Sequence, residues 1–530
     1  MRDKMAIVQE KRNQLLQGGG DKEIEKQHKQ GKLTARQRLE LLLDPGTFQE
    51  IELWIKPIKT GFNIDQKVLA GDAVITGFGQ INGRNVYAYS HDFTVVGGSM
   101  SSGQDHKVTR LIEMAMEAGL PYIGIVDSGG VRIHDLFGRS AFRPIQAGRL
   151  GIGGTSGIFA GPSLASGQIP QISLMLGPCY AGSAYSPTLA DFIIMQKETC
   201  YMSVASPQLL KTVTYRDVTQ EEIGGAELHA TVTGTADYLA KSDEEAIEFC
   251  RELFAYLPLN CYQNPPVAET TDNPDRQEER LLQIVPGDPS SPYDMHEVIR
   301  LIVDDGKFTE IMGLFAGSMI IGFARMNGKT VGIVANNPAD NNGILTIDTC
   351  DKEARFIRFC DAFNIPLLFL VDTPGFMSSV EQEKSEDGLI RTAARPVFAI
   401  AEATVPMITL YIGRCFGTAR LIMGTPRLGM DMVYSWPSAR VARMDPEKAV
   451  EIIYAQEITT SIEPEAIKKQ KLTELSEHYI TYPLHAAEQQ MVHDIIDPRS
   501  TRSVIIRTLN NLENKKPAPG PWRKHSLIPR

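Results

Sequence analysis

Alternating apolar and polar residues form two hairpin patterns, one in each half of the chain. The first runs from 74 to 93 and the second from 319 to 336, and each is interrupted by Asn-Gly, at Asn82-Gly83 and Asn327-Gly328. An Asn-Gly pair between alternating runs favours a two-residue turn joining antiparallel strands. The pattern therefore predicts one β-hairpin in each half.

Short, continuously apolar runs follow each hairpin. They cover residues 122–127, 171–176, 367–372 and 407–412, and such runs are typical of strands buried on both faces of a sheet. Between them, 106–119 and 351–363 carry apolar residues at helical spacing. A strand, a helix and a second strand joined by short turns form a βαβ crossover. Each half is therefore expected to be an α/β domain.

Four segments of the first half recur in the same order in the second half. Val126-Asp127-Ser128-Gly129 returns as Val371-Asp372-Thr373-Pro374 at an offset of 245 residues, and the segment from Ile169 to Cys179 returns from Val405 to Cys415 at an offset of 236. Such an ordered recurrence indicates two homologous domains. We place them at 1–260 and 261–530, because 260–276 is rich in Pro, Asn and Asp.

Composition excludes several classes of protein. The net charge of -10 over 530 residues lacks the basic excess of nucleic-acid-binding proteins. No run of about 18 apolar residues indicates a membrane span, so a cytoplasmic location, or a mature organellar form, is expected. The seven cysteines are scattered and never spaced CxxC, which predicts reduced thiols and no structural metal.

Two glycine-containing segments resemble nucleotide-binding motifs without matching them. Residues 322–330 have glycines one residue too far apart for a P-loop and coincide with the hairpin turn. The run 148–157 misses the dinucleotide fingerprint and is expected to be a flexible loop. His91, His106 and His134 are interpreted as structural histidines, since no catalytic triad or metal motif includes them.

Small residues after neighbouring strands are the strongest candidate site. Asp127-Ser128-Gly129-Gly130 ends one predicted strand, and 177–184 follows the next. Backbone N–H groups in such turns can hold an oxyanion. Residues 414–419 offer the same arrangement in the second half. Two oxyanion sites without an evident side-chain base suggest that a cofactor brings the base.

Longer runs carry a family resemblance. The segments 31–36, 91–99, 127–130 and 185–187 in the first half, and 331–334, 354–356, 359–366 and 401–406 in the second, are similar to the β subunits of propionyl-CoA and methylcrotonyl-CoA carboxylases. The resemblance extends from about residue 6 to residue 497. It implies two tandem crotonase-like domains built on the ββα superhelix, with acyl-CoA bound by the first half and carboxybiotin by the second.

The resemblance also implies site residues and partners. The amides of Ala181 and Gly182 would hold the thioester enolate, and those of Thr418 and Ala419 the ureido oxygen of biotin. Substrate contacts would come from Gly98, Gly129, Gly130 and Leu421, with no metal. Such subunits typically form hexamers, with active sites between the first half of one chain and the second half of another. The chain lacks a biotin-acceptor Ala-Met-Lys-Met and an ATP-binding domain, so biotin carboxylase and the biotin carboxyl carrier are expected on separate chains.

Departures from the family pattern concern the substrate. Leu421 stands where propionyl-CoA-using relatives have an acidic residue, and 134–166 forms a longer loop. A different or larger acyl group is therefore expected. Three alternatives stay open at this point: the same subunit in a transcarboxylase or a biotin-dependent decarboxylase, a crotonase-like hydratase or hydrolase without biotin, and a non-catalytic assembly subunit.

Overall fold

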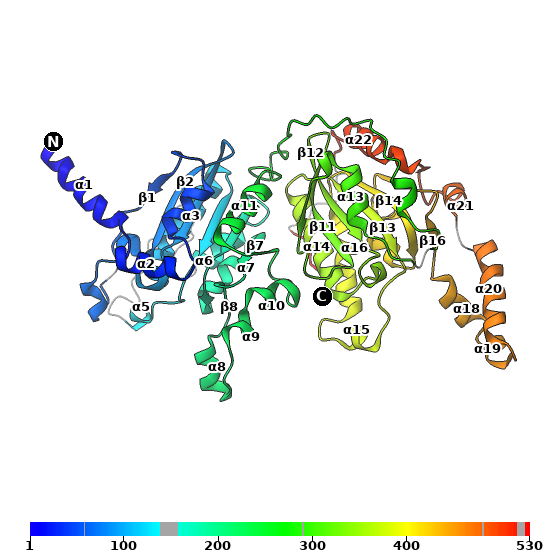
Figure 1. Ribbon diagram of the computed structural model, residues 1–530, viewed down its shortest axis with the longest axis horizontal. Coiled ribbons are helices and arrows are strands. Elements are labelled where there is room, and N and C mark those ends of the chain that lie inside the picture. Colours follow the sequence, from blue (N-terminus) through cyan, green and yellow to red (C-terminus); the bar gives the residue numbers. More distant parts are fainter. Residues whose placement is uncertain (58, 138–156, 289–290, 480–481, 517–524, 530) are drawn as a thin grey trace. The chain divides into compact units, whose positions relative to one another are not determined.

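The computed structural model describes residues 1–57, 59–137, 157–288, 291–479, 482–516 and 525–529. The chain divides into two compact units, Met1–Gln263 and Asn264–Arg530, a division close to the one expected at residue 260. Each unit contains one large sheet with helices packed against it (Figure 1).

The first unit is built on a sheet of order β1-β2-β3-β4-β5-β7-β9. Its strands are β1 Gln49–Ile51, β2 Val74–Ile81, β3 Arg84–His91, β4 Tyr122–Val126, β5 Gln171–Met175, β7 Phe192–Gln196 and β9 Tyr238–Ala240. The first three strands pair antiparallel, and the strands from β3 to β9 pair parallel. A separate short parallel pair joins β6 Cys179–Tyr180 to β8 Met202–Ser203.

The second unit repeats this order as β10-β11-β12-β13-β14-β15-β17, with β16 paired to β14. Its strands are β10 Phe308–Ile311, β11 Met319–Met326, β12 Lys329–Asn336, β13 Leu367–Thr373, β14 Met407–Phe416, β15 Met432–Ser435, β16 Arg440–Ala442 and β17 Asp494–Ile495. The hairpin is again antiparallel, and the strands after it are parallel. Two α/β units with the same strand order are therefore present, as predicted.

Both predicted hairpins are confirmed, and their turns have the expected backbone. Asn82 and Gly83 have φ of 51° and 73°, and Asn327 and Gly328 have φ of 52° and 78°. A two-residue turn with positive φ at both positions matches the right-handed twist of the strands it joins.

Helices α4 Ser102–Ala118 and α14 Ile347–Ala362 occupy the two predicted crossover positions. Ser101 and Thr346 cap their N-termini by accepting hydrogen bonds from the N–H groups of Gln104 and Thr349. The other helices of the first unit are α1 Arg2–Leu16, α2 Asp21–Lys29, α3 Ala35–Leu42, α5 Ile133–Phe137, α6 Gly157–Ala165, α7 Tyr185–Thr188, α8 Pro207–Thr214, α9 Gln220–Gly224, α10 Ala226–Thr231 and α11 Asp243–Phe254.

The remaining helices of the second unit cover its sheet and extend beyond it (Figure 1). They are α12 Leu281–Ile284, α13 Met295–Ile302, α15 Val380–Lys384, α16 Leu389–Glu402, α17 Ala419–Ile422, α18 Pro446–Ile453, α19 Ala455–Thr460, α20 Pro464–Tyr479, α21 Pro483–Glu488 and α22 Thr501–Asn511.

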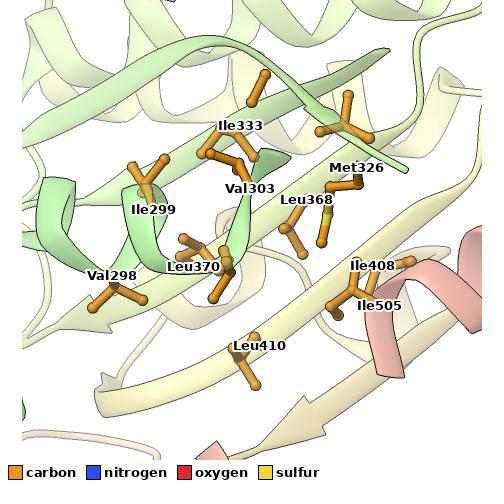
Figure 2. Packing of buried hydrophobic residues seen from close by; sticks show 14 of the residues in the cluster. Val298, Ile299, Val303, Met326, Ile333, Leu368, Leu370, Ile408, Leu410 and Ile505 are labelled. Atoms are coloured by element: carbon orange, nitrogen blue, oxygen red, sulfur yellow. The ribbon is translucent and has the colours of Figure 1, made fainter. Parts of the chain in front are cut away.

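The core of the second unit lies between its sheet and two helices. Figure 2 shows Val298 and Ile299 of α13 and Ile505 of α22 facing Leu368, Leu370, Ile408 and Leu410 of the central strands. Each of these side chains is at most 1% exposed. Burying one such side chain contributes roughly 1.5 to 3 kcal/mol. The central strands β13 and β14 are buried at every position.

The expected long loop from 134 to 166 is partly helical, which corrects that expectation. Residues at its two ends belong to α5 and α6. Helix α6 packs its small residues against α4, since a Cβ at Gly157 would lie 2.2 Å from Oγ1 of Thr109. Residues 138–156, which include most of the glycine-rich run 148–157, lie outside the described residues.

Candidate functional site

The first candidate loop begins where β6 ends. The 3₁₀ helix Ala181–Ala184 follows Tyr180 directly and continues into α7. In a 3₁₀ helix each N–H donates three residues back, so its first N–H groups have no acceptor inside the helix. The amides of Ala181 and Gly182 stand at this position. The turn therefore offers two neighbouring donors for an oxyanion.

The second candidate loop has the same construction at the end of β14. Gly417 has φ of 63°, and its N–H donates to the Ala442 oxygen at 3.1 Å. Thr418 then caps α17, which begins at Ala419. The N–H groups of Thr418 and Ala419 are the first of a helix, where no intrahelical acceptor exists. Leu421 lies in the same helix and is 37% exposed.

Ala181 and Gly417 occupy corresponding positions of the two repeats, and both have a left-handed backbone. Ala181 has φ of 55°, a conformation that costs a residue with a Cβ roughly 1 to 2 kcal/mol. We expect Ala181→Gly to raise the free energy of unfolding by about 1 kcal/mol because it removes this strain. Chemical denaturation of both proteins measures the difference. A variant no more stable than the parent would show that the alanine is unstrained.

The glycines assigned to substrate contacts lie beside the first loop. Gly98 has φ of 61°, and a Cβ there would lie 2.2 Å from the Asp127 oxygen, so this position requires glycine. The N–H of Gly129 donates to the Gly97 oxygen at 2.8 Å, and that of Gly130 donates to Ser128 Oγ at 3.1 Å. The Gly129 amide joins this loop to that of Gly97, whereas the Gly130 amide closes a turn within its own loop. A substrate contact by Gly98, Gly129 or Gly130 stays a prediction.

A buried ionic cluster supports the strand that ends in Asp127. Its carboxylate accepts hydrogen bonds from Lys32 Nζ at 2.7 Å and Arg38 Nη1 at 2.8 Å, and Arg38 Nε also binds Asp243 at 2.8 Å. The side chains of Lys32, Arg38 and Asp127 are at most 3% exposed. Burial lowers the pKa of Lys32 against the attraction of Asp127. Lys32 belongs to the family segment 31–36, but its pairing with Asp127 was not predicted. No spacing pattern relates residues 95 positions apart.

The second unit holds its corresponding carboxylate differently. Asp372 binds Arg414 Nε at 2.8 Å and accepts from Tyr293 Oη at 2.9 Å. Glycines make room for both carboxylates, because a Cβ at Gly177 or Gly413 would lie 1.9 or 2.0 Å from a carboxylate oxygen of Asp127 or Asp372. Asp127, which follows β4, and Asp372, near the end of β13, therefore support the loops that follow these strands.

Two hollows with basic side chains lie near Gly97 in the first unit. One of about 370 Å³ is lined by residues that include Lys26, Lys67, Phe93 and Gly97. The other, of about 410 Å³, is lined by residues that include Lys11, Lys56, Lys59, Lys67, Trp54 and Arg132. An aromatic ring among lysines suits a ligand that carries both a flat base and phosphates.

None of the seven cysteines, all of which lie among the described residues, forms a disulfide bond. The part of the chain that the structure describes contains no group of three or more His, Cys, Asp or Glu side chains that could hold a metal ion. None of its described helices is long and apolar enough to cross a membrane.

The chain is similar to known proteins along nearly its whole length. The carboxyl transferase domain model matches residues 26–528. The propionyl-CoA carboxylase beta chain of Roseobacter denitrificans is 43% identical, with both chains fully covered. The methylmalonyl-CoA decarboxylase subunit alpha of Propionigenium modestum is 41% identical over 99% of each chain. The solved transcarboxylase 12S hexamer, with methylmalonyl-coenzyme A bound, is 39% identical, has a TM-score of 0.92, and covers 100% of this chain and 98% of its own.

Proposed function

The chain belongs to the carboxyl transferase family, as the carboxyltransferase subunit of a biotin-dependent acyl-CoA carboxylase with two crotonase-like domains, and we propose how its two halves divide the reaction. The observation that carries the proposal is the pair of corresponding loops, Ala181-Gly182 and Thr418-Ala419, each with amides at the start of a helix. Two oxyanion sites match a reaction in which two carbonyl compounds each gain negative charge.

The first unit binds the acyl-CoA. The amides of Ala181 and Gly182 hold the thioester oxygen and stabilise the charge that develops there when the α-proton leaves. Stabilisation of charge that appears only during the reaction lowers the barrier, which binding of the ground state alone does not. The basic hollows lined by Lys26, Lys56 and Lys67 take the CoA nucleotide, with Gly98, Gly129 and Gly130 beside the pantetheine path.

The second unit receives carboxybiotin, which supplies the CO2 and the base when it is bound. The residues present fit this group, because Thr418 and Ala419 present amide donors while the neighbouring Gly417 amide is engaged by Ala442. These two donors hold the ureido oxygen. Carrier and biotin carboxylase are separate chains in this proposal, the subunit forms a homo-hexamer, needs no metal, and works in the cytoplasm or an organellar matrix.

Reconstitution tests this function. The purified chain alone should neither consume ATP nor fix bicarbonate, whereas addition of a biotin carboxylase and a biotinylated carrier should restore carboxylation of an acyl-CoA. Labelled bicarbonate and thin-layer separation of the acids measure the product. Bicarbonate fixation by the chain alone would rule out separate partner chains.

The direction of the reaction depends on the partners. A decarboxylase subunit at 41% identity and the transcarboxylase 12S hexamer at 39% identity keep the decarboxylase and transcarboxylase roles as the second candidate. Affinity capture from the native source separates them: an ATP-dependent biotin carboxylase favours carboxylation, and a membrane decarboxylase subunit favours the reverse direction.

Leu421 gives a prediction about chain length. A carboxylate in the acyl pocket disfavours apolar chains, whereas leucine offers contact worth about 0.8 kcal/mol per buried CH2. Leu421→Asp should shift preference toward acetyl-CoA or propionyl-CoA by about 1 to 3 kcal/mol. The ratio of kcat/KM values from acetyl-CoA to octanoyl-CoA measures the shift. An unchanged ratio with a lowered melting temperature would mean that Leu421 only packs α17.

A further inference from the structure

A small cavity lies behind the first candidate loop. Ser183 and Ser186 form its wall on the loop side, and His91, Gln104 and Asp105 form its polar wall. The other lining residues are Tyr89, Met100, Val108, Val126, Ile158 and Pro187. The cavity encloses about 20 Å³, which is room for one group of the size of a water molecule or a hydroxyl.

The cavity is adjacent to the position where the thioester would react. Ser183 directly follows Gly182, whose amide is the predicted enolate donor. Met100 connects the two places, because it lines the cavity and its terminal methyl lies 3.9 Å from the point where a Cβ on Gly182 would stand. An acyl chain held at Gly182 is therefore next to this space.

Gln104 lines the cavity and has an unpaired side-chain oxygen. Its Nε2 donates to the backbone oxygens of Ala73 and Gly98, at 3.2 Å each. These two bonds determine which end of the amide is the nitrogen, so Oε1 is the end left without a partner among the described residues. The residue is 1% exposed, and water outside the protein cannot satisfy this oxygen.

Asp105 and His91 add further unpaired groups to the same wall. Both carboxylate oxygens of Asp105 and Nδ1 of His91 have no hydrogen-bond partner in the described structure, and the residues are 6% and 8% exposed. Burial lowers the pKa of His91 to about 4, so its ring is neutral near pH 7. Burial raises the pKa of Asp105 to about 7. The Ile158 N–H and the Thr109 hydroxyl oppose this shift from nearby without reaching hydrogen-bond geometry.

Unpaired polar groups of this kind are costly to keep. Each buried donor or acceptor without a partner lowers the stability of the folded protein, and a methyl group in the cavity would leave these groups without a partner. A group that both donates and accepts, and that fits the volume of one hydroxyl, satisfies them. An alcohol on the acyl chain has these properties, while an alkyl end has neither.

On the basis of the function proposed above, we propose that this cavity is the far end of the acyl site and that His91, Gln104 and Asp105 select a hydroxyl on the acyl chain. The preferred substrate is then a short hydroxyacyl-CoA rather than an alkyl thioester of the same shape. The hydroxyl donates its single proton to Asp105 or to Gln104 Oε1, and its oxygen accepts from Nδ1–H of neutral His91.

Isosteric thioesters test this inference. 3-Hydroxypropionyl-CoA and butyryl-CoA differ by a hydroxyl in place of a methyl group, and 4-hydroxybutyryl-CoA and pentanoyl-CoA form a second pair. Calorimetry on the full-length chain gives Kd without turnover, and the reconstituted carboxylase gives kcat/KM. We expect the hydroxyl compound of at least one pair to be favoured by tenfold or more. Asp105→Leu should abolish or reverse that preference, while Asp105→Asn, which keeps a hydrogen-bonding side chain, should retain part of it.

Glu113→Gln is the matched control, because Glu113 is a buried carboxylate in the same helix α4 that does not line the cavity. It should leave the preference unchanged, and melting curves check that each variant is folded. Equal binding of both members of each pair, as a cavity that only holds fixed water would give, overturns the inference. Persistence of the preference in folded Asp105→Leu overturns it as well. If no thioester binds, the proposed function is wrong, and the assignment of the cavity to the acyl site is wrong as well.

Discussion

Gly182→Pro is expected to lower kcat/KM for the acyl-CoA by about 10²- to 10³-fold, the usual effect of losing one oxyanion donor, because proline has no N–H. Decarboxylation of the carboxylated carrier without acyl-CoA should change far less, since that step uses the second loop. Ala419→Pro should produce the opposite pattern. The two rates, measured for both variants, test the assignment of one loop to each ligand.

Gly182→Ala and Ala419→Gly are the controls for this pair, because both keep the N–H. The three atoms nearest to a Cβ at Gly182 belong to Phe159, Met100 and Val131, at 3.7 to 4.0 Å, so the alanine fits without displacement. Both controls should retain most of the activity that the prolines remove. Equal loss of both partial reactions in folded proline variants would contradict the assignment.

Asp127→Ala is expected to destabilise the first unit by about 3 to 5 kcal/mol. Removing this carboxylate leaves the ammonium of Lys32 and the guanidinium of Arg38 buried, with side chains 3% and 0% exposed, and breaking one side of a buried ion pair leaves an uncompensated charge. Asp243 still pairs with Arg38, so Lys32 bears most of the loss. Chemical denaturation monitored by a probe in the first unit measures it.

Asp217→Ala provides the comparison, because the Lys211–Asp217 pair is 62% and 83% exposed, and exposed pairs contribute about 0 to 1 kcal/mol. Combining Asp127→Ala with Lys32→Met should recover part of the lost stability by removing the stranded charge. A loss below 1 kcal/mol for Asp127→Ala would show that water reaches the cluster, and that it does not hold the loop.

The local elements were predictable because their causes are local. Asn82-Gly83 and Asn327-Gly328 adopt positive φ, a conformation that few other residue pairs adopt easily. The apolar runs that form β4, β5, β13 and β14 are separated by segments with helical spacing, which form α4 and α14. The recurrence of four segments at similar offsets predicted two homologous domains from the sequence alone. Small residues after neighbouring strands indicated the two loops, and the family resemblance implied which of their amides act. Neither could show that Ala181 has a left-handed backbone.

The tertiary structure alone decided which side chains meet. Lys32 reaches Asp127 across 95 positions, and Arg38 reaches Asp243 across 205, distances over which no periodicity acts. The polar wall of the small cavity likewise joins His91 at the end of β3 with Gln104 and Asp105 near the start of α4. Local spacing determines the face of a strand or helix that a residue occupies, but strand register and helix packing determine what faces it. The buried ion pairs and the polar wall of the cavity depend on strand register and helix packing.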